Sequence, residues 1–270
     1  MSILDEIFAD KRVEVAQRQQ LRPLAEVRRA AESAAPAKDF PGALLARNRQ
    51  SGRPALIAEV KQASPSRGLL VQDFDPLRLA ATYRDHGAAA ISVLTDERYF
   101  KGHLDYLRQI AELEPRAARP PLLRKDFIYD PYQVYEARAA GADAVLLIAA
   151  HLEPRQLADL HRLALELGMA PLVEVHSRAE LESVLPCAPR MVGVNNRDLR
   201  DFSVSLETTL QLRPFIPAGV VVVAESGIHT AGDIRRLAEQ DVNAILVGEA
   251  LVTAPDVAGK VREMAGEAAA

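Results

Sequence analysis

Residues 122–148 read LLRKDFIYDPYQVYEARAAGADAVLLI, and this stretch determines the fold class. The runs 121–125, which begins one residue before it, and 142–148, at its end, are short and almost continuously apolar, which is typical of strands in a parallel sheet covered on both faces. The segment between them, 131–140, has helical periodicity, begins with proline after an aspartate and is followed by glycine, as helix start and stop signals predict. The stretch therefore predicts a strand, a helix and a second parallel strand.

The same alternation extends over most of the chain. Eight strand-like runs rich in Val, Ile, Leu and Ala occur, at 55–60, 88–94, 121–125, 142–148, 170–175, 190–195, 219–225 and 244–248. Stretches with helical periodicity lie between them, at 76–86, 102–114, 131–140, 154–167, 178–185, 206–212 and 230–239. Eight such units over about 220 residues fit a (β/α)8 TIM barrel, which typically takes about 250. A doubly wound open sheet is the alternative, but no Gly-x-Gly-x-x-Gly follows the first strand run, where a dinucleotide-binding fold needs it.

Residues 1–50 precede this alternation. We expect them to form an N-terminal helical extension packed on a barrel of residues 51–270, in one domain overall. Within the extension, 2–20 form an amphipathic helix whose apolar residues lie near one face, Ile3, Leu4, Ile7, Phe8 and Val15. This helix either closes the bottom of the barrel or covers the mouth of an active site, and the periodicity leaves both placements open.

Composition narrows the class of protein. A chain of 270 residues with 49% hydrophobic residues can bury a large single core. The net charge of −4 is spread over mixed acidic and basic residues, so nucleic acid is not expected as the main partner. The single cysteine, Cys187, excludes an internal disulfide framework and favours a reducing compartment. Because the N-terminus is not a signal peptide and no apolar run is long enough to span a membrane, we expect a cytoplasmic protein that does not bind membranes.

Polar residues end several of the strand runs. Glu59 and Lys61 are two positions apart and share a strand face with Ile57, whose apolarity indicates that the face points into the barrel. Four further strand runs end in or carry polar residues, Lys125, Glu174, Asn195 and Glu225. Any one of them, a single lysine above all, is more simply explained as a solvated rim charge or a structural ion pair. Together they indicate a catalytic site, because active sites lie at this rim and burying several ionisable groups is costly.

Small residues in the last two strand loops indicate a phosphate site. Ser226-Gly227 and Gly248-Glu249 let backbone N–H groups approach an anion, at the place where barrels commonly bind phosphate. A simple turn is the less favoured reading of these glycines. The six histidines are scattered, without the spacing of metal ligands, so we expect no metal.

Seven strand-end motifs together resemble one family. AEVKQASPSRG, SVLTDERYFKG, LLRKDFIYDPYQVYEARAAGADAVLLI, LVEVH, GVNNRDL, AESGI and LVGEAL resemble, in order, the motifs of indole-3-glycerol-phosphate synthase of tryptophan biosynthesis. The resemblance implies a (β/α)8 barrel whose N-terminal helices cross the mouth, and no metal or organic cofactor. The reaction it implies is closure of 1-(2-carboxyphenylamino)-1-deoxyribulose 5-phosphate, a small phosphorylated substrate, to indole-3-glycerol phosphate with loss of carbon dioxide and water, a carboxy-lyase reaction.

The resemblance also implies catalytic roles. Lys125 matches the lysine that protonates the substrate ketone, and Glu174 the acid/base of the later proton transfers and dehydration. Lys61 matches a lysine near the substrate anions, and its share of the proton transfer with Lys125 is left open. Glu59 and Asn195 match polar groups that hold the lysines and the substrate hydroxyls. For Glu174, an ion pair with Lys61 or Lys125 is compatible with the acid/base role.

Binding roles follow in the same way. Glu225 is expected among the substrate-binding groups. Ser64 and Arg197 resemble the groups that contact the anthranilate carboxylate. The residues that resemble the walls around its ring are Phe100, Phe127 and Leu199. The phosphate-binding positions are Ser226, Gly227, Gly248 and Glu249. Several relatives carry a small residue in place of Glu249, and a carboxylate beside a phosphate would repel it, so Glu249 is expected to act through its backbone.

Two other functions compete with this interpretation. One is a Schiff-base aldolase on the same barrel, with Lys125 or Lys61 as nucleophile, which requires a strongly lowered lysine pKa. The other is a phosphate-binding barrel without catalysis, which is disfavoured because the polar strand ends are complete. The sibling isomerase of the same pathway is also disfavoured, since its expected Cys/Asp pair has no match near the first strand. We expect a monomer.

Overall fold

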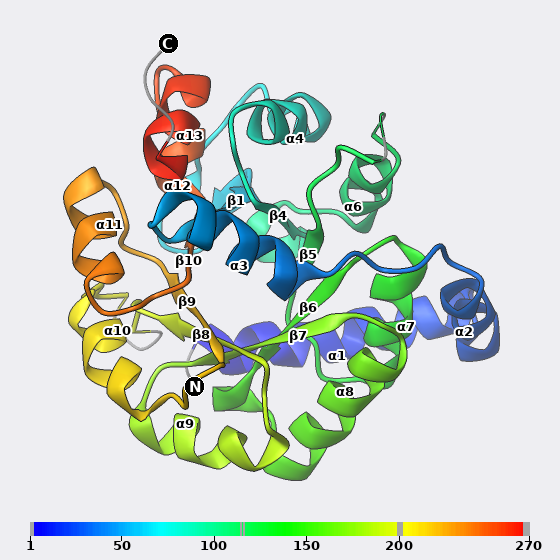
Figure 1. The fold of residues 1–270 in the computed structure, drawn as a ribbon. Coiled ribbons are helices and arrows are strands. Elements are labelled where there is room, and N and C mark those ends of the chain that lie inside the picture. Colours follow the sequence, from blue (N-terminus) through cyan, green and yellow to red (C-terminus); the bar gives the residue numbers. More distant parts are fainter. Residues whose placement is uncertain (1–2, 114, 116, 199–201, 267–270) are drawn as a thin grey trace.

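The computed structural model describes residues 3–113, 115, 117–198 and 202–266, which form a closed parallel barrel (Figure 1). Its neighbouring strands run in the order β1, β10, β9, β8, β7, β6, β5 and β4, and β4 pairs with β1 to close it. The strand bounds are β1 Ala55–Val60, β4 Ala90–Leu94, β5 Leu122–Lys125, β6 Ala144–Ile148, β7 Ala170–Val175, β8 Met191–Asn195, β9 Val221–Glu225 and β10 Ala244–Val247. The predicted (β/α)8 barrel is confirmed and the doubly wound sheet is wrong.

Helices surround the barrel. Those between or after the strands are α4 Pro76–Asp85, α5 Glu97–Phe100, α6 Leu104–Ala111, α7 Pro131–Ala139, α8 Pro154–Glu166, α9 Arg178–Val184, α10 Glu207–Leu212, α11 Ala231–Ala238, α12 Glu249–Val252 and α13 Val257–Ala265. Aspartates cap α4 and α7 ahead of the predicted prolines, because their side chains accept from backbone N–H groups of the first turn. Short 3-10 turns follow β6, α9 and α10, at Ala149–His151, Leu185–Cys187 and Arg213–Phe215.

Alternation along the strands separates two apolar layers. In β1, Ala55 and Ile57 belong to the cluster inside the barrel, whereas Leu56 and Ala58 pack in the layer between strands and helices. Glu59 continues the inward series, as its spacing from Ile57 predicted. Consecutive side chains at the end of a strand therefore point to opposite faces of the sheet, and only every second one can reach the interior of the barrel.

Three helices precede β1, and they cover both ends of the barrel. α1 Ile3–Leu21 and α3 Phe40–Ser51 each contribute apolar side chains to the inner cluster, while α2 Leu24–Glu32 packs on α7. Figure 1 shows α3 crossing in front of the strands and α1 lying behind them. The side chains of α1 reach the carboxyl ends of the strands, so this helix covers the mouth of the barrel. The bottom of the barrel, which was the alternative position for this first helix, is closed by α3.

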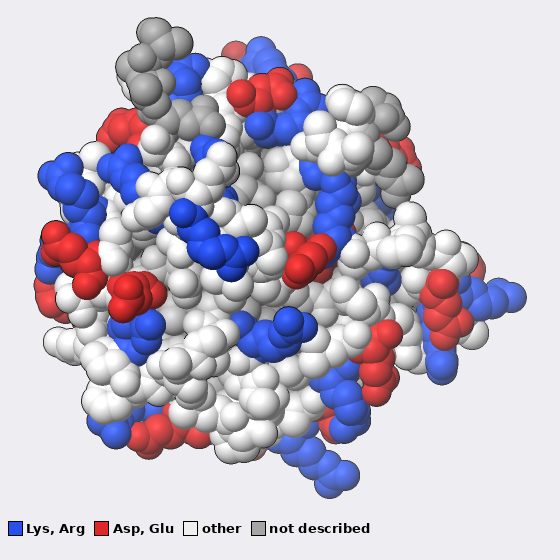
Figure 2. All heavy atoms as spheres, in the orientation of Figure 1, with Lys and Arg blue, Asp and Glu red and all other residues white. Residues whose placement is uncertain are grey.

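Some local predictions were inaccurate. The helix expected at 102–114 is shorter, α6, and the four-residue α5 and the hairpin of β2 Ala63–Ser64 with β3 Gly68–Leu69 were not predicted. Elements this short show no measurable periodicity, so the sequence pattern cannot reveal them. The charge prediction agrees with the face drawn in Figure 2, where basic and acidic side chains are interspersed.

Candidate active site

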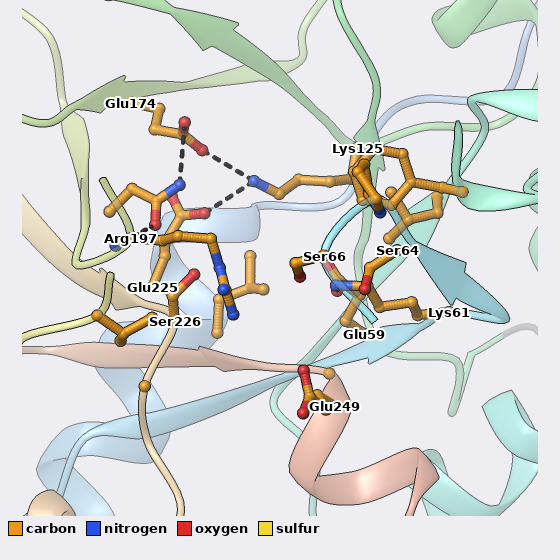
Figure 3. Close-up of a pocket in the computed structure, with 18 of the residues that line it drawn as sticks. Glu59, Lys61, Ser64, Ser66, Lys125, Glu174, Arg197, Glu225, Ser226 and Glu249 are labelled. Carbon is orange, nitrogen blue, oxygen red and sulfur yellow. Dashed lines mark hydrogen bonds and ion pairs between the residues drawn. The ribbon is translucent and has the colours of Figure 1, made fainter. Parts of the chain in front are cut away.

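A cavity of about 520 Å³ opens at the carboxyl ends of the strands. Inward side chains from β1, β5, β7, β8 and β9 line it, and Ile3, Leu4 and Ile7 of α1 close part of its mouth. Figure 3 shows the polar groups converging from opposite sides of this space. The barrel thus brings together side chains that are far apart in the sequence.

Lys125 is the centre of the polar cluster. Its Nζ donates to Oε2 of Glu174 and to Oε2 of Glu225, both at 2.9 Å (Figure 3). Both carboxylates are almost completely buried, with side chains 3% and 2% exposed. The other oxygen of Glu174, Oε1, accepts from the Asn195 amide at 3.3 Å. The predicted ion pair of Glu174 is therefore made with Lys125.

The two carboxylates have opposite pKa shifts. Burial raises the pKa of Glu174, but attraction by Lys125 and His176 outweighs it and lowers the value to about 2. At Glu225 burial prevails over the attraction of Lys125, repulsion by Glu174 adds to it, and the pKa is raised to about 7. Burial lowers the pKa of Lys125, but the surrounding glutamates outweigh it and hold the pKa above its ordinary value. The cluster therefore combines an ammonium, a stable carboxylate and a carboxyl group that exchanges its proton near neutral pH.

Two glycines make room for the buried carboxylates. A Cβ added to Gly193 on β8 would lie 2.2 Å from Oε1 of Glu225. A Cβ added to Gly248 would lie 2.4 Å from Oε1 of Glu59. Since such distances are far inside van der Waals contact, any larger residue at either position would displace the carboxylate. Gly248 was predicted only as part of a phosphate cradle, and Gly193 was not singled out.

Glu59 and Lys61 form the ion pair that their spacing allowed, with Oε1 3.1 Å from Nζ. The buried Tyr83 hydroxyl donates to the carbonyl oxygen of Glu59 at 3.1 Å, which fixes this strand end. Lys61 Nζ also lies 5.6 Å from the centroid of the Phe100 ring, within cation–π range. Lys61 therefore faces both the polar cluster and an aromatic wall.

The aromatic wall combines three phenylalanines. The rings of Phe100 and Phe127 are 5.9 Å apart, and Phe8 of α1 meets Phe127 edge-on at 5.6 Å. The Phe8 ring stacks in turn on His151 at 3.8 Å. The covering helix thus contributes directly to the packing behind the wall.

A comparison of the whole chain with known proteins fits this geometry. Residues 4–264 match the family model described as indole-3-glycerol phosphate synthase. The chain belongs to the indole-3-glycerol phosphate synthase family. The prediction from the strand-end motifs is thereby confirmed, together with the expectation of a carboxy-lyase that closes the indole ring.

Individual relatives and structures agree. Indole-3-glycerol phosphate synthase of Roseiflexus castenholzii is 53% identical over 269 residues, which cover 98% of each chain, and that of Polaromonas sp. is 52% identical over 254 residues, 94% of each. Among solved structures, 3-hexulose-6-phosphate synthase from Salmonella typhimurium matches with a TM-score of 0.63 and 14% identity, covering 78% of this chain and 97% of that one. Thiamine phosphate pyrophosphorylase from Pyrococcus furiosus has a TM-score of 0.56 and 18% identity, covering 80% and 96%. At these identities the solved structures support the fold alone.

The residues predicted to bind the carboxylate lie at the cavity in this family member. Ser64 lies in β2, and its buried Oγ has no hydrogen-bond partner among the described residues. Arg197 follows β8, and its backbone N–H donates to Oδ1 of Asn195 at 3.0 Å. Both residues line the cavity. Leu199 lies outside the described residues.

The predicted phosphate-binding residues line another part of the cavity. Ser226 and Gly227 both have left-handed φ values, 67° and 75°, directly after β9. Gly248 precedes α12, and Glu249 is its first residue. The Glu249 carboxylate lies 3.6 Å from Nε of Arg67, so the repulsion expected from this carboxylate is reduced by a cation. Arg67 also lines the cavity and was not predicted.

A buried ion cluster beneath α1 was also not predicted. Lys11 Nζ lies 2.9 Å from Asp96 and 3.0 Å from Asp126, and its side chain is 1% exposed. Asp126 also pairs with the fully buried Arg124 at 3.0 Å. A signal for it existed, because Lys11 lies four residues from both Ile7 and Val15 on the apolar face of the helix. A lysine on such a face indicates a buried partner.

Among the described residues, no group of three or more His, Cys, Asp or Glu side chains could hold a metal ion. No helix in the described part of the chain is both long and apolar enough to cross a membrane.

Proposed function

We propose that the cavity at the carboxyl ends of the strands is where this chain closes the indole ring of 1-(2-carboxyphenylamino)-1-deoxyribulose 5-phosphate. The observation that carries the proposal is the ammonium of Lys125 held at 2.9 Å between Glu174 and Glu225 inside an aromatic-walled cavity. A fixed cation there stabilises the negative charge that develops on the ketone oxygen during ring closure. Water has limited access because α1 covers part of the mouth.

The proposed sequence of steps uses the described side chains. The aromatic carbon that carries the carboxylate attacks the ketone while Lys125 protonates the ketone oxygen. Loss of carbon dioxide returns the bonding electron pair to the ring. The new hydroxyl then leaves as water, with Glu174 handling the proton transfers and Asn195 orienting the groups. Glu225, with its pKa near 7, can hold a proton beside them.

Binding roles are proposed for the remaining groups. Ser64 and Arg197 meet the carboxylate, with Leu199 among the ring-wall residues, and Phe100 and Phe127 press the anthranilate ring toward the ketone. The loops after β9 and β10 receive the phosphate through Ser226, Gly227, Gly248 and the backbone of Glu249. Lys61, beside Glu59, faces the substrate anions. The positions around one cavity of those that the structure describes support this assignment.

A Schiff-base aldolase is less well supported. A nucleophilic lysine must lose its proton, but the glutamates around Lys125 raise its pKa. Borohydride reduction in the presence of a ketose phosphate tests the alternative, and a covalent adduct on Lys125 or Lys61 would favour it. The non-catalytic barrel lacks support because the polar strand ends are all present.

The direct experiment is to add the substrate to the purified protein and follow indole fluorescence. We expect product to form without an added cofactor. The absence of a fluorescence signal would favour a phosphate-binding barrel without catalytic activity. We further propose a cytoplasmic monomer. The mixed surface charge, the single cysteine and a cavity assembled from one chain support this proposal.

A further inference from the structure

Proton balance sets a requirement on this site, given the proposed function. The ketone oxygen leaves as water and so takes two protons. One is released from the substrate carbon beside the nitrogen when the indole double bond forms. The carboxylate leaves as carbon dioxide and supplies none. One proton must therefore enter from solvent in every turnover to restore the ammonium of Lys125.

Lys125 lines the cavity and is 15% exposed, but a bound substrate would fill that side, so the proton needs a route that does not pass through the cavity. Glu174 and Glu225 both touch Lys125, and both are nearly inaccessible to water. Oε1 of Glu225 is buried against Gly193 and has no hydrogen-bond partner among the described residues. The outer oxygen of Glu174 instead faces a second ionisable group.

That group is His176, at the start of the loop between β7 and α9. Its Nδ1 makes a hydrogen bond with Oε2 of Glu180 at 3.3 Å. Its Nε2 is buried 3.4 Å from Oε1 of Glu174 and makes no hydrogen bond with a described residue, so transfer between these two atoms requires a small rotation of the ring. Exposure increases along the series, from 3% at Glu174 through 14% at His176 to 24% at Glu180. The lining of the cavity includes Glu174 but neither of the other two. His176 therefore borders the site through Glu174 and not through the cavity.

Glu180 is held in place for this contact. Its Oε2 accepts from the backbone N–H of His176 at 2.8 Å, and its Oε1 accepts from the Ser177 hydroxyl at 3.0 Å. Ser177 caps α9 by accepting from the Glu180 N–H. The loop, the cap and the imidazole thus form one rigid unit against the end of β7.

We propose that Glu180, His176 and Glu174 form the relay that returns one proton per turnover from solvent to Lys125. A protonated imidazole has one N–H toward each carboxylate. The ring with its proton on Nε2 gains a second proton at Nδ1 from the Glu180 side and then gives the Nε2 proton to Oε1 of Glu174. The neutral ring is left with a proton on Nδ1, and a tautomer exchange, with no net gain or loss of protons, returns that proton to Nε2 before the next turnover. Rotation of the Glu174 carboxyl group exchanges its oxygens, and the proton passes over 2.9 Å to Lys125.

The charges around His176 suit it to this role. The charged groups facing it are Glu174 on β7, Glu180 on α9 and Glu225 on β9. Burial lowers the pKa of His176, but the hydrogen bond to Glu180 and the attraction of these carboxylates outweigh it and raise the pKa above its ordinary value. The ring is therefore protonated over more of the neutral range than a free imidazole.

The test compares three variants in the fluorescence assay at fixed pH and ionic strength. His176→Gln keeps an amide donor but cannot carry a proton, Glu180→Gln removes the outer carboxylate, and Glu182→Gln is the matched control on the same helix, 59% exposed. For His176→Gln we expect kcat to fall at least about tenfold with KM nearly unchanged, since proton transfer by a positioned group is worth about a hundredfold or more. Added imidazole should restore its kcat and leave the wild type unaffected. Glu180→Gln should show a smaller loss and Glu182→Gln none.

The outcomes separate the hypotheses. Wild-type kcat in His176→Gln, or a loss that imidazole does not repair, would overturn the relay. Absence of product with the wild type would overturn the proposed function itself. If His176→Gln does not fold, NMR titration of the wild-type histidines decides: one of them should titrate above the ordinary range and move down in Glu180→Gln, and no such histidine would overturn the relay.

Discussion

Glu174 and Glu225 share one ammonium but titrate far apart. The hydrogen bonds to Lys125 are equal in length, so the difference comes from the remaining surroundings. Glu174 has Asn195 and His176 beside its second oxygen, whereas the second oxygen of Glu225 has no partner among the described residues. Different environments for two neighbouring carboxyl groups are a common way of separating acid from base in one site.

Glu225 should make the free energy of unfolding decrease as the pH rises. Its pKa rises from 4.5 to about 7 on folding, so the folded chain keeps a proton that the unfolded chain loses. The stabilisation is present below pH 4.5 and is lost as pH rises to about 7, at about 1.4 kcal/mol per pH unit. Urea unfolding at pH 5 and pH 7 should therefore show a smaller decrease in Glu225→Gln than in the wild type. Equal decreases would show that Glu225 is ionised throughout.

Gly193→Ala tests how tightly the same carboxylate is placed. The new methyl group would lie 2.2 Å from Oε1 of Glu225 and must displace it from Lys125. We expect kcat to fall about a hundredfold, because an error of about 1 Å in a catalytic group can cost that much. Gly232→Ala, where the nearest atom is 3.3 Å away, is the control. Unchanged kcat in Gly193→Ala would mean that the position of Glu225 is not critical.

At the scale of elements, α1 is attached to the barrel by charge as well as by apolar packing. Lys11 inserts among Asp96, Asp126 and Glu14, and attraction by the aspartates overcomes burial to raise its pKa. The carboxylate of Asp126, one residue after Lys125, joins this cluster to the end of β5. The covering helix and the proposed catalytic lysine are thus fixed by adjacent residues.

Lys11→Met should destabilise the protein. Removing one partner of a buried ion pair leaves the other charge uncompensated, which costs about 3 kcal/mol or more. We expect the free energy of unfolding in urea to fall by that amount, whereas Arg28→Met, which breaks an exposed pair on α2, should change it little. A loss no larger than that of the control would show that α1 is held by its apolar face alone.

Element prediction from sequence succeeded where a repeated signal was present. The apolar strand runs and the proline-initiated helices located the barrel, and Ile57 correctly placed Glu59 on the inner face. The hairpin after β1 and the helix α5 lack a period and were missed. The choice of Lys125 over Lys61 as the partner of Glu174 was also open, because it depends on strand tilt and stagger around the barrel. The spacing of residues in the sequence carries no information on strand tilt or stagger.

At the scale of the whole molecule, the site is a product of closure. β1 and β10 lie at opposite ends of the strand sequence and become neighbours only when the barrel closes, which brings Gly248 against Glu59. The space that the Glu59 carboxylate of β1 needs is therefore provided by Gly248, directly after β10. Such a relation follows from topology and could not be predicted from either segment.

The proposed monomer is also a property of the whole molecule. The proposed catalytic and binding groups in the described residues all line a cavity of a single chain. Light scattering coupled to gel filtration should therefore give the mass of one chain at the concentrations used in the assay. A stable dimer whose dissociation abolished activity would contradict the proposal.

The central claim is that Lys125, held between Glu174 and Glu225, drives ring closure. Its most direct test is the initial rate of indole fluorescence at saturating substrate in Lys125→Ala, with the exposed Lys101→Ala as control and circular dichroism to verify folding. The rate should fall at least about a hundredfold in a folded protein, since the proton donor and the fixed positive charge are both lost. A folded Lys125→Ala variant that turns over at the rate of the control would contradict the account.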